Sequence, residues 1–397
     1  MNLPVVTLLP GHVQPVHAGH PWIYAQAIAR VEGGALVGDE VAVVDPRGVF
    51  LGRGFYSPKS AIPVRVLVRD KVAAIDGAFF RERIARAASL RRDVGLPSRR
   101  TSGFRLVHAE GDDLPGLIVD VFDDVCVLQL NTAGMKRREG LILQALEDIR
   151  HPRAIWDRTS REIAKTEEYV PTGGTVRGDE QIDALRFEER GFRFELPREI
   201  SQKTGFYFDQ RGLRDRVEQL SENRRVLDCY SFVGSFGLAA ARGGAREVRC
   251  VDESALALTV GAEVARPFPW GSRVHFERED ARVVLKRAQR EPYDLVICDP
   301  PKLVPRRAAK EDGLAAYRKL YAEAVRATKP LGLLVVCSCS GAVRLDDLIR
   351  ALALGARDAD RRAVVLERHF QGPDHPVSAA FPEGLYLKSV IARIEPR

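Results

Sequence analysis

Two segments with chemically distinctive side chains each follow an apolar run in the C-terminal half of the sequence. Asp299-Pro300-Pro301-Lys302 follows the run Tyr293–Cys298, and Ser338-Cys339-Ser340-Gly341 follows the run Leu331–Val336. The two proline rings restrict the backbone beside Asp299, so its carboxylate is held in a fixed direction. A cysteine thiol is a strong nucleophile because part of it is already thiolate near neutral pH. The two segments predict one pocket that combines a carboxylate with a nucleophilic sulfur.

This combination suits the methylation of a carbon atom that is itself a poor nucleophile, such as carbon 5 of cytosine. Addition of the Cys339 thiolate to carbon 6 turns the ring into an enamine and moves electron density onto carbon 5. The Asp299 carboxylate can accept a hydrogen bond from the cytosine amino group. The competing interpretation is that Cys337 and Cys339 are only small hydrophobic residues of a buried strand.

The segment Arg225–Gly237 has the pattern of a strand, a turn and the start of a helix. Such a turn lies at the carboxyl edge of a doubly wound sheet, where these folds bind ligands. It lacks the Gly-x-Gly-x-x-Gly pattern that places amides against a pyrophosphate. Asp228 stands at the strand end instead, which suits a ligand with an ammonium group, such as the methionine part of S-adenosylmethionine. We expect Asp228, Tyr230 and Gly234 to bind this cofactor.

Two further acids end the next two predicted strands. Asp252 is placed to bind the ribose hydroxyls of an adenosine ligand. Asp280 follows the third strand, where a carboxylate can reach the adenine amino group. Acids at strand ends also cap helices, which is the competing interpretation for each of them. Their succession on an alternating sheet, followed by Asp299, favours the cofactor site.

The elements around these segments predict three domains. Residues 1–72 contain short strands and the turn Asp45-Pro46-Arg47-Gly48, which is typical of a hairpin in a small β-barrel. Residues 73–190 combine strands with helices predicted over 76–94 and 134–149, which indicates a small α+β domain. Residues 191–397 alternate helices with strands, which predicts an α/β doubly wound sheet. Those strands are expected at 225–229, 248–252, 273–276, 294–298, 332–337, 362–368 and 386–394.

Composition sets broader limits. The chain has 397 residues, 29% of them charged, and a net charge of +7. No apolar stretch approaches the roughly 20 residues needed to cross a bilayer, and the N-terminus lacks the features of a signal peptide. None of the 6 cysteines is part of a set at metal-ligand spacing. We therefore expect a cytoplasmic protein without a metal site, and the basic charge favours nucleic acid mildly.

Several segments together resemble those of a known family: Glu110–Asp120, Gln202–Arg211, Asp299–Lys302, Ser338–Gly341, Asp374–Val377 and Pro382–Lys388. In these segments the chain is similar to the class I S-adenosylmethionine-dependent 23S rRNA (cytosine-5)-methyltransferases with an N-terminal PUA domain. The resemblance covers nearly the whole chain. One departure is Arg282, which stands where an apolar aromatic residue is usual.

The resemblance implies a PUA-like barrel over 1–72, a central α+β domain over 73–190 and a Rossmann-like methyltransferase domain over 191–397, often as a homodimer. It implies that Cys339 is the nucleophile and that 23S rRNA is the substrate. Lys302 stands where better-known RNA cytosine methyltransferases have a second cysteine, which implies a one-cysteine arrangement. Beside the cofactor, the candidates are Phe206, Asp209 and Gln210.

Basic residues dominate the segment after Asp299. Residues 302–329 contain 8 basic and 3 acidic side chains, which predicts a phosphate-binding wall that includes Lys302, Arg306 and Arg307. The equally weighted interpretation is the solvated face of a helix over 312–327. Two rival functions remain at this point. One is a guanine-directed rRNA methyltransferase on the same scaffold, and the other is a non-catalytic RNA-binding protein.

Overall fold

The structure is a computed structural model that describes residues 3–200 and 204–397. Gln202 and Lys203 of the Gln202–Arg211 segment lie outside the described residues. The chain divides into two compact units, the first formed by residues 1–208 with 373–384 and the second by 209–372 with 385–397. The first unit contains both predicted N-terminal domains, and the three-domain boundaries at 72 and 190 stay a prediction. In the described ranges, no helix combines the length and apolarity that a membrane crossing requires.

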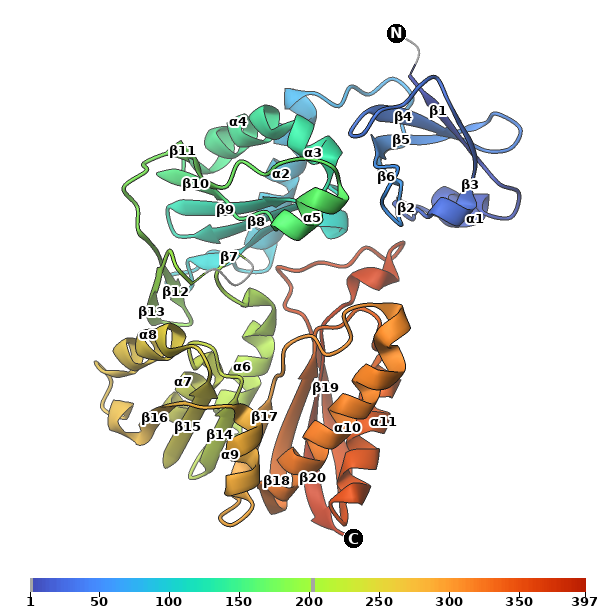
Figure 1. Ribbon diagram of the computed structural model, residues 1–397. Coiled ribbons are helices and arrows are strands. Elements are labelled where there is room, and N and C mark those ends of the chain that lie inside the picture. Colours follow the sequence, from blue (N-terminus) through green and yellow to red (C-terminus); the bar gives the residue numbers. More distant parts are fainter. Residues whose placement is uncertain (1–2, 201–203) are drawn as a thin grey trace. The chain divides into compact units, whose positions relative to one another are not determined.

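The N-terminal sheet of the first unit has the strand order β2-β6-β5-β4-β1-β3 (Figure 1). The predicted turn joins β4 to β5. The Asp45 carboxylate stabilises it by accepting hydrogen bonds from the amides of Arg47 and Val49, both at 2.8 Å. The segment 22–28 has the apolar pattern of a single strand, but a 3₁₀ turn at Ala25–Ala27 separates the strand at Trp22–Ile23 from the one that begins at Ile28. The elements are β1 (Val5–Leu8), α1 (Val13–His17), β2 (Trp22–Ile23), β3 (Ile28–Glu32), β4 (Glu40–Val44), β5 (Phe50–Tyr56) and β6 (Val64–Val68).

A second sheet of the first unit has the order β11-β10-β9-β8-β7 and packs against α2 and α4. Asp76 caps α2 by accepting a hydrogen bond from the Phe79 amide at 3.0 Å. The helix predicted over 134–149 is two helices that meet at Arg138. The elements are α2 (Gly77–Asp93), β7 (Gly103–His108), β8 (Leu117–Phe122), β9 (Val125–Leu130), α3 (Ala133–Arg137), α4 (Glu139–Arg150), β10 (Ala154–Asp157), α5 (Arg161–Thr166), β11 (Gly174–Gly178) and the hairpin β12 (Ala184–Glu189) and β13 (Phe192–Pro197).

The second unit is a twisted sheet with the order β16-β15-β14-β17-β18-β20-β19. Its strands pair in parallel from β16 to β18, and β20 runs antiparallel to both β18 and β19. The strand order changes direction between β14 and β17, the kind of position at which open α/β sheets bind ligands. The predicted strands are all present: β14 (Arg225–Cys229), β15 (Glu247–Asp252), β16 (Val274–Arg278), β17 (Tyr293–Cys298), β18 (Thr328–Ser338), β19 (Arg361–Phe370) and β20 (Lys388–Pro396).

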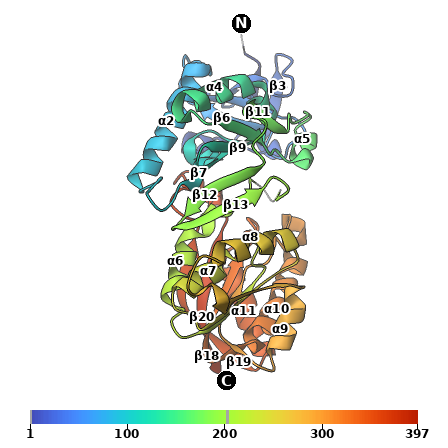
Figure 2. The same cartoon turned by 90° about the vertical axis from the view of Figure 1, so that its left-hand side faces the viewer.

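Helices cover both faces of this sheet, as Figures 1 and 2 show. On one face, strand residues such as Val226 and Ile297 pack with residues of α6 and α7. On the other face, the alternate residues, such as Leu227 and Cys298, pack with α9, α10 and α11. Burial of alternate side chains against two helical layers explains the consecutive apolar residues of the central strands, at Leu295–Cys298 in β17 and Leu333–Cys337 in β18. The helices are α6 (Arg211–Gln219), α7 (Ser235–Arg242), α8 (Ala255–Ala265), α9 (Ala281–Ala288), α10 (Lys310–Arg326) and α11 (Leu345–Asp358).

Candidate active site

The loop after β14 has an unusual backbone. Tyr230, Phe232 and Gly234 have φ angles of 61°, 53° and 70°. Such angles are unfavourable for residues with a Cβ atom, and they cluster where a structure holds a loop for function. The Phe232 amide donates to Asp252 Oδ2 at 2.8 Å, which ties the loop to the end of β15. Tyr230 and Gly234 therefore belong to a loop with a fixed shape at the sheet edge, as a cofactor loop requires.

Asp228 lies at the end of β14 and is fully buried. Its Oδ2 accepts a hydrogen bond from the Gly237 amide at 2.9 Å, while its Oδ1 has no hydrogen-bond partner in the described part of the chain. Burial raises the pKa of this carboxyl to about 8, and the charges of Asp299 and Asp252 act in the same direction. A buried acceptor without a partner costs free energy unless a ligand satisfies it. An ammonium group of the cofactor fits this position by charge and by hydrogen bonding.

Gly237 makes this arrangement possible. A Cβ atom at Gly237 would lie 2.2 Å from Cys250 Sγ and 3.0 Å from Val248 Cγ1. A side chain at position 237 would therefore prevent the start of α7 from packing this closely against β15. The close packing brings the Gly237 amide to the Asp228 carboxylate.

Asp252 ends β15 and accepts hydrogen bonds with both oxygens. Oδ2 binds the Phe232 amide, and Oδ1 binds the Ser254 amide at 2.9 Å. The carboxylate thus organises two adjacent loops, and each oxygen keeps a lone pair for a further donor. This geometry supports ribose binding by Asp252, which stays a prediction.

Asp280 caps α9 by accepting from the Arg282 amide at 2.8 Å, and it also pairs with the Arg282 guanidinium at 2.6 Å. The hydrogen bond from that side chain holds the pKa of Asp280 below its usual range. The structure shows the helix cap that was the competing interpretation for Asp280. The carboxylate also lies at the same edge of the sheet as Asp252, where the cofactor interpretation expects it. Arg282, which departs from the family pattern, is the partner of this carboxylate, and adenine binding by Asp280 stays a prediction.

Asp299 follows β17, next to β14 in the sheet. Gln210 Nε2 donates to Asp299 Oδ2 at 3.0 Å, and Gln210 is 4% exposed. Neighbouring Asp209 accepts a hydrogen bond from the Tyr386 hydroxyl. The structure therefore brings Gln210 to the predicted catalytic carboxylate, where a side-chain amide fixes the direction of one oxygen.

Phe206, the third candidate of this segment, lies in the first unit. Its ring is 5.0 Å from that of Phe187 and 5.1 Å from those of Phe194 and Phe208, measured between centroids. It is 3% exposed. The packing accounts for Phe206 as part of an aromatic cluster with the β12–β13 hairpin, and a cofactor contact stays a prediction.

Cys339 follows β18 and differs from the other cysteines. Among the described residues, the five other cysteine side chains are buried and Cys339 is partly exposed. Burial raises the pKa values of Cys298 and Cys337 well above the usual range, which keeps both as thiols. Cys337 packs in the apolar core on one face of the sheet, as expected for a small hydrophobic residue of a buried strand. Cys339 lies beyond the end of that strand.

The residues beside Cys339 fix its backbone. Ser338 and Ser340 are both fully buried. Ser338 Oγ accepts from the Tyr317 hydroxyl of α10 at 2.9 Å, and Ser340 Oγ accepts from the Val304 amide at 3.4 Å. The Ser-Cys-Ser pattern thus places two anchored serines around one accessible thiol. This role of the serines was not predicted from the sequence.

Three of the basic residues after Asp299 lie between β17 and α10. Lys302, Arg306 and Arg307 are all exposed. Their exposure fits a surface that meets phosphates, and it equally fits the solvated-face interpretation, so RNA binding by these residues stays a prediction.

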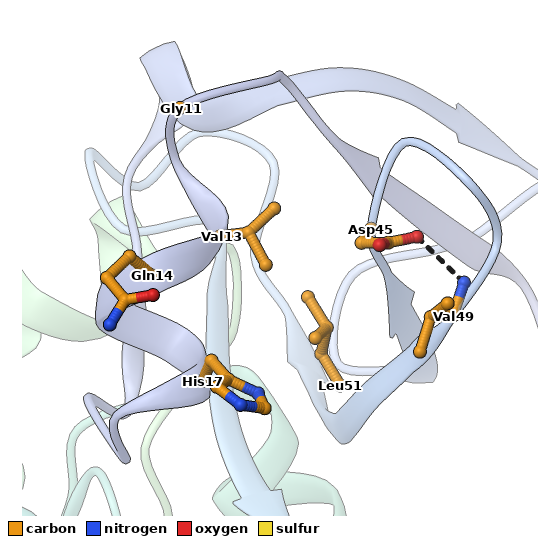
Figure 3. Close-up of a pocket in the computed structure, with 7 residues that line it drawn as sticks. All are labelled: Gly11, Val13, Gln14, His17, Asp45, Val49 and Leu51. Atoms are coloured by element: carbon orange, nitrogen blue, oxygen red, sulfur yellow. Dashed lines mark hydrogen bonds between the residues drawn. The ribbon is translucent and has the colours of Figure 1, made fainter.

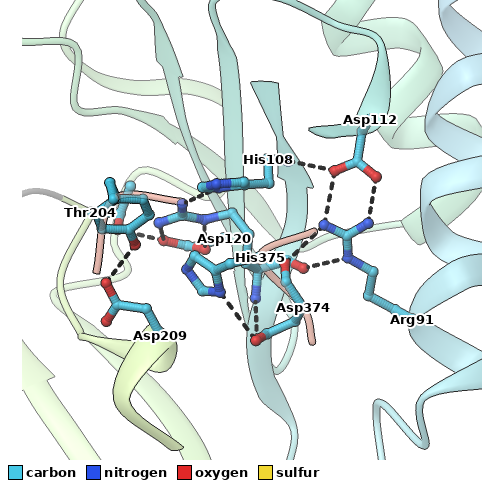
Figure 4. Close-up of polar contacts among 10 residues, drawn as sticks. Arg91, His108, Asp112, Asp120, Thr204, Asp209, Asp374 and His375 are labelled. Carbon is cyan, nitrogen blue, oxygen red and sulfur yellow. Dashed lines mark hydrogen bonds and ion pairs between the residues drawn. The ribbon is translucent and has the colours of Figure 1, made fainter. Parts of the chain in front are cut away.

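The segment Pro373–Gly384 leaves the second unit between β19 and β20 and belongs to the first. Arg91 of α2, which is fully buried, pairs with Asp112 through Nη2 and Oδ2 at 2.8 Å and donates to the Asp374 carbonyl at 2.8 Å (Figure 4). The Asp374 carboxylate accepts from the Arg105 amide at 3.1 Å. Two family-like segments, at Asp112 and at Asp374, therefore meet in one buried ionic network.

Two histidines and a second ion pair continue this network. Arg105 pairs with Asp120 at 2.9 Å between Nη2 and Oδ2, and the Thr204 hydroxyl also donates to Asp120. The rings of His108 and His375 lie 4.9 Å apart (Figure 4). Burial lowers the pKa of His108 well below its usual value, and His375 and Arg105 act in the same direction. The network therefore joins β7, β8 and the segment Pro373–Gly384 within the first unit.

A pocket of about 430 Å³ lies on the N-terminal sheet domain, between α1 and the β4–β5 hairpin (Figure 3). Val13, Val49 and Leu51 supply its apolar lining, and Gln14 and His17 supply polar groups. These lining residues all belong to the first unit, whereas Asp228, Asp252, Asp299 and Cys339 belong to the second.

Two family models match parts of this chain. Residues 6–69 match the model of a PUA-like domain, and residues 104–386 match that of an S-adenosylmethionine-dependent methyltransferase. The chain is 36% identical to ribosomal RNA large subunit methyltransferase I of Shewanella denitrificans, over 98% of this chain and 99% of the relative. Its identity to the protein of the same name from Citrobacter koseri is 35%, with the same coverage.

Among solved structures, the fold resembles that of a putative methyltransferase from Streptococcus mutans, with a TM-score of 0.83 and 17% identity over 99% of this chain and 100% of the other. A similar chain with the same TM-score was crystallised in complex with SAH. The predicted architecture of a PUA-like domain with a Rossmann-like methyltransferase fold is confirmed. The chain belongs to the S-adenosylmethionine-dependent methyltransferase family that includes the ribosomal RNA large subunit methyltransferases I, and S-adenosylmethionine is its cofactor.

Proposed function

We propose that this methyltransferase forms 5-methylcytosine in 23S rRNA through a covalent adduct between Cys339 and carbon 6 of the target base. The relatives' name supports the large-subunit RNA as the substrate. The observation that carries the chemistry is the contrast between the partly exposed Cys339 and the buried cysteines around it. The Asp299 carboxylate on the adjacent strand end supports a cytosine, whose amino group is a hydrogen-bond donor.

In the proposed reaction, the Cys339 thiolate attacks carbon 6, and the new S–C bond makes carbon 5 nucleophilic. Bound S-adenosylmethionine supplies the electrophilic methyl group. After methyl transfer, carbon 5 loses its proton to a base, and the S–C bond breaks to release the Cys339 thiolate and the aromatic ring. Asp299, held by Gln210 at 3.0 Å, orients the base through its amino group.

Contacts to the RNA come from two regions in this proposal. The exposed side chains of Lys302, Arg306 and Arg307 neutralise phosphates near the target base. The PUA-like domain provides a second hold on structured RNA. A homodimer and a cytoplasmic location stay expectations.

The rival functions make different demands on the site. A guanine-directed methyltransferase has no need of a nucleophilic thiol at Cys339. A non-catalytic RNA-binding protein has no need of a buried carboxylate at Asp228 that lacks a partner for one oxygen. The specific features of the second unit therefore favour a catalytic, thiol-dependent enzyme.

The test compares Cys339→Ala with Cys337→Ala, a matched substitution two residues earlier, within β18. Cys339→Ala should abolish methylation while it still binds cofactor and RNA, and Cys337→Ala should keep most of the activity. RNA with 5-fluorocytosine at the target should trap a covalent complex with the wild type, because fluorine blocks the final elimination. The trap should fail with Cys339→Ala. Full activity of Cys339→Ala would exclude the adduct mechanism and favour the guanine-directed rival.

A further inference from the structure

Lys388 is an unusual residue for its position. It begins β20, where it pairs in register with Ser338 of β18, and it is only 4% exposed. Lysine is rarely buried to this extent unless its ammonium group has partners. Its position opposite Ser338 brings it beside the strand end that leads into Cys339.

The ammonium group of Lys388 holds the loop that follows Cys339. Nζ donates to the Ser340 carbonyl at 2.8 Å and to the Val343 carbonyl at 2.6 Å. An ammonium has three N–H donors, and these two carbonyls take two of them. The loop after Cys339 is therefore fastened from β20 by a cation, and not only by the hydrogen bonds of Ser338 and Ser340.

Lys388 also lies within electrostatic reach of Cys339. Burial lowers the pKa of Lys388 to about 8, and a thiolate at Cys339 is the strongest charge that opposes this shift. The Asp347 carboxylate of α11 acts in the same direction as that thiolate, and the Lys302 ammonium acts against it. Asp347 is itself paired with Lys310 at 2.7 Å. A charge on Cys339 also acts on Tyr317 of α10, where it contributes to a raised pKa of the phenol after the larger effect of burial.

We infer that Lys388 is a positioning residue for Cys339. Lys388 anchors the Ser340–Val343 loop, and its ammonium group stabilises the thiolate form of Cys339. The interaction is mutual, since a thiolate that favours the ammonium is favoured by it to the same extent. The catalytic importance of this pair rests on the proposed function. No proton moves through Lys388: its charge is present when the thiolate attacks, and the thiolate is released beside the same charge when the S–C bond breaks.

The experiment measures the alkylation rate of Cys339 by iodoacetamide between pH 5.5 and 10, in the full-length protein, with peptide mapping by mass spectrometry. Lys388→Gln keeps a donor for the loop but removes the charge, and Lys388→Arg keeps the charge. Lys329→Gln is the matched control, since Lys329 lies near the opposite end of β18 and pairs with Asp294 at 2.7 Å. Cofactor binding by calorimetry verifies that each variant is folded.

In Lys388→Gln, alkylation of Cys339 at pH 7 should slow about tenfold, and its half-maximal rate should move to higher pH by about one unit. Lys388→Arg should restore most of the wild-type profile, and Lys329→Gln should not change it. The kcat of methylation should fall in Lys388→Gln and recover partly as the pH rises. Coincident alkylation profiles of wild type and folded Lys388→Gln would overturn the inference.

A measurement on the wild type needs no variant to fold. Cys339 should reach its half-maximal alkylation rate at lower pH in the folded protein than in urea, and the opposite order would overturn the inference. Failure of the proposed function is distinguishable, because it appears as full activity of Cys339→Ala. That outcome would remove the catalytic role of the pair, whereas the alkylation profile alone decides whether Lys388 stabilises the thiolate.

Discussion

Substitution of Asp228 by Asn tests the cofactor site most directly. The change keeps the size of the side chain and an oxygen that can accept from the Gly237 amide, which lies 2.9 Å from Oδ2. It removes the negative charge that burial makes unfavourable. We expect Asp228→Asn to stabilise the protein without ligand at neutral and alkaline pH and to weaken binding of S-adenosylmethionine.

The magnitude follows from the pKa of Asp228, which burial raises from the ordinary 3.8 to about 8. Because the folded-state pKa is above that of the unfolded chain, folding loses stability as the pH rises from 3.8 towards 8. The loss is about 1.4 kcal/mol per pH unit, which gives about 4 kcal/mol at pH 7. A buried Asn amide without a full set of acceptors costs about 1–3 kcal/mol. The net gain of Asp228→Asn should be about 1–3 kcal/mol at pH 7 and close to zero at pH 5.

The assay is thermal and urea unfolding of the protein without ligand at pH 5 and pH 8, together with calorimetry of cofactor binding. Asp294→Asn is the control with the opposite sign. Burial acts to raise the pKa of Asp294, but hydrogen bonds from the Lys329 side chain and the Arg225 amide hold it below its usual range. Stability from Asp294 is therefore present at neutral pH and lost as the pH falls through the folded-state pKa. Asp294→Asn should destabilise the protein at pH 8.

Two results would refute this reasoning. Equal destabilisation by Asp228→Asn at pH 5 and pH 8 would show that the folded protein does not raise the pKa of the Asp228 carboxyl. Unchanged cofactor affinity at pH 8 would show that the Asp228 charge does not bind the ligand's ammonium group. In the wild type, affinity for the cofactor should rise from pH 6 towards pH 8 as Asp228 ionises, because only the carboxylate pairs with an ammonium.

Three further predictions follow from other parts of the structure. Asp252→Ala should weaken cofactor binding by about 1–3 kcal/mol through lost ribose contacts, and unchanged affinity in calorimetry would contradict the assignment. Arg91→Met should destabilise the protein by about 3–5 kcal/mol in urea unfolding, since it leaves the buried Asp112 carboxylate without its partner; a loss below about 1 kcal/mol would contradict this account. Replacement of Lys302, Arg306 and Arg307 together by Gln should weaken RNA binding and reduce its dependence on salt concentration, while cofactor affinity stays unchanged. An unaltered salt dependence in filter binding would show that these side chains belong to the solvated surface.

The sequence alone was sufficient to predict the alternating sheet of the second unit and the order of its acids. Asp228, Asp252 and Asp299 each follow a short stretch of apolar residues, which is typical of parallel strands buried on both faces. Their carboxyl ends necessarily meet at one edge of the sheet. The same reasoning placed Cys339 beyond a strand end, and the structure separates it from the buried Cys337 two residues earlier.

The local sequence pattern did not predict where helices and strands are interrupted. The break at Arg138 divides a segment that was predicted as one helix, and the 3₁₀ turn at Ala25–Ala27 interrupts a largely apolar segment that is typical of a strand. Both depend on how the flanking elements pack, which periodicity does not encode.

Only the tertiary structure showed which distant residues act together. Lys388 is 49 positions from Cys339 in sequence, and the antiparallel pairing of β20 with β18 brings it to the loop that follows the cysteine. The pairing of Arg91 with Asp112 and with the Asp374 carbonyl depends equally on the return of the segment Pro373–Gly384 to the first unit. A sequence determines local periodicity and the ends of strands, whereas strand order and the burial of charge depend on contacts between segments that are remote along the chain. The partners of a buried cation are therefore decided by the fold.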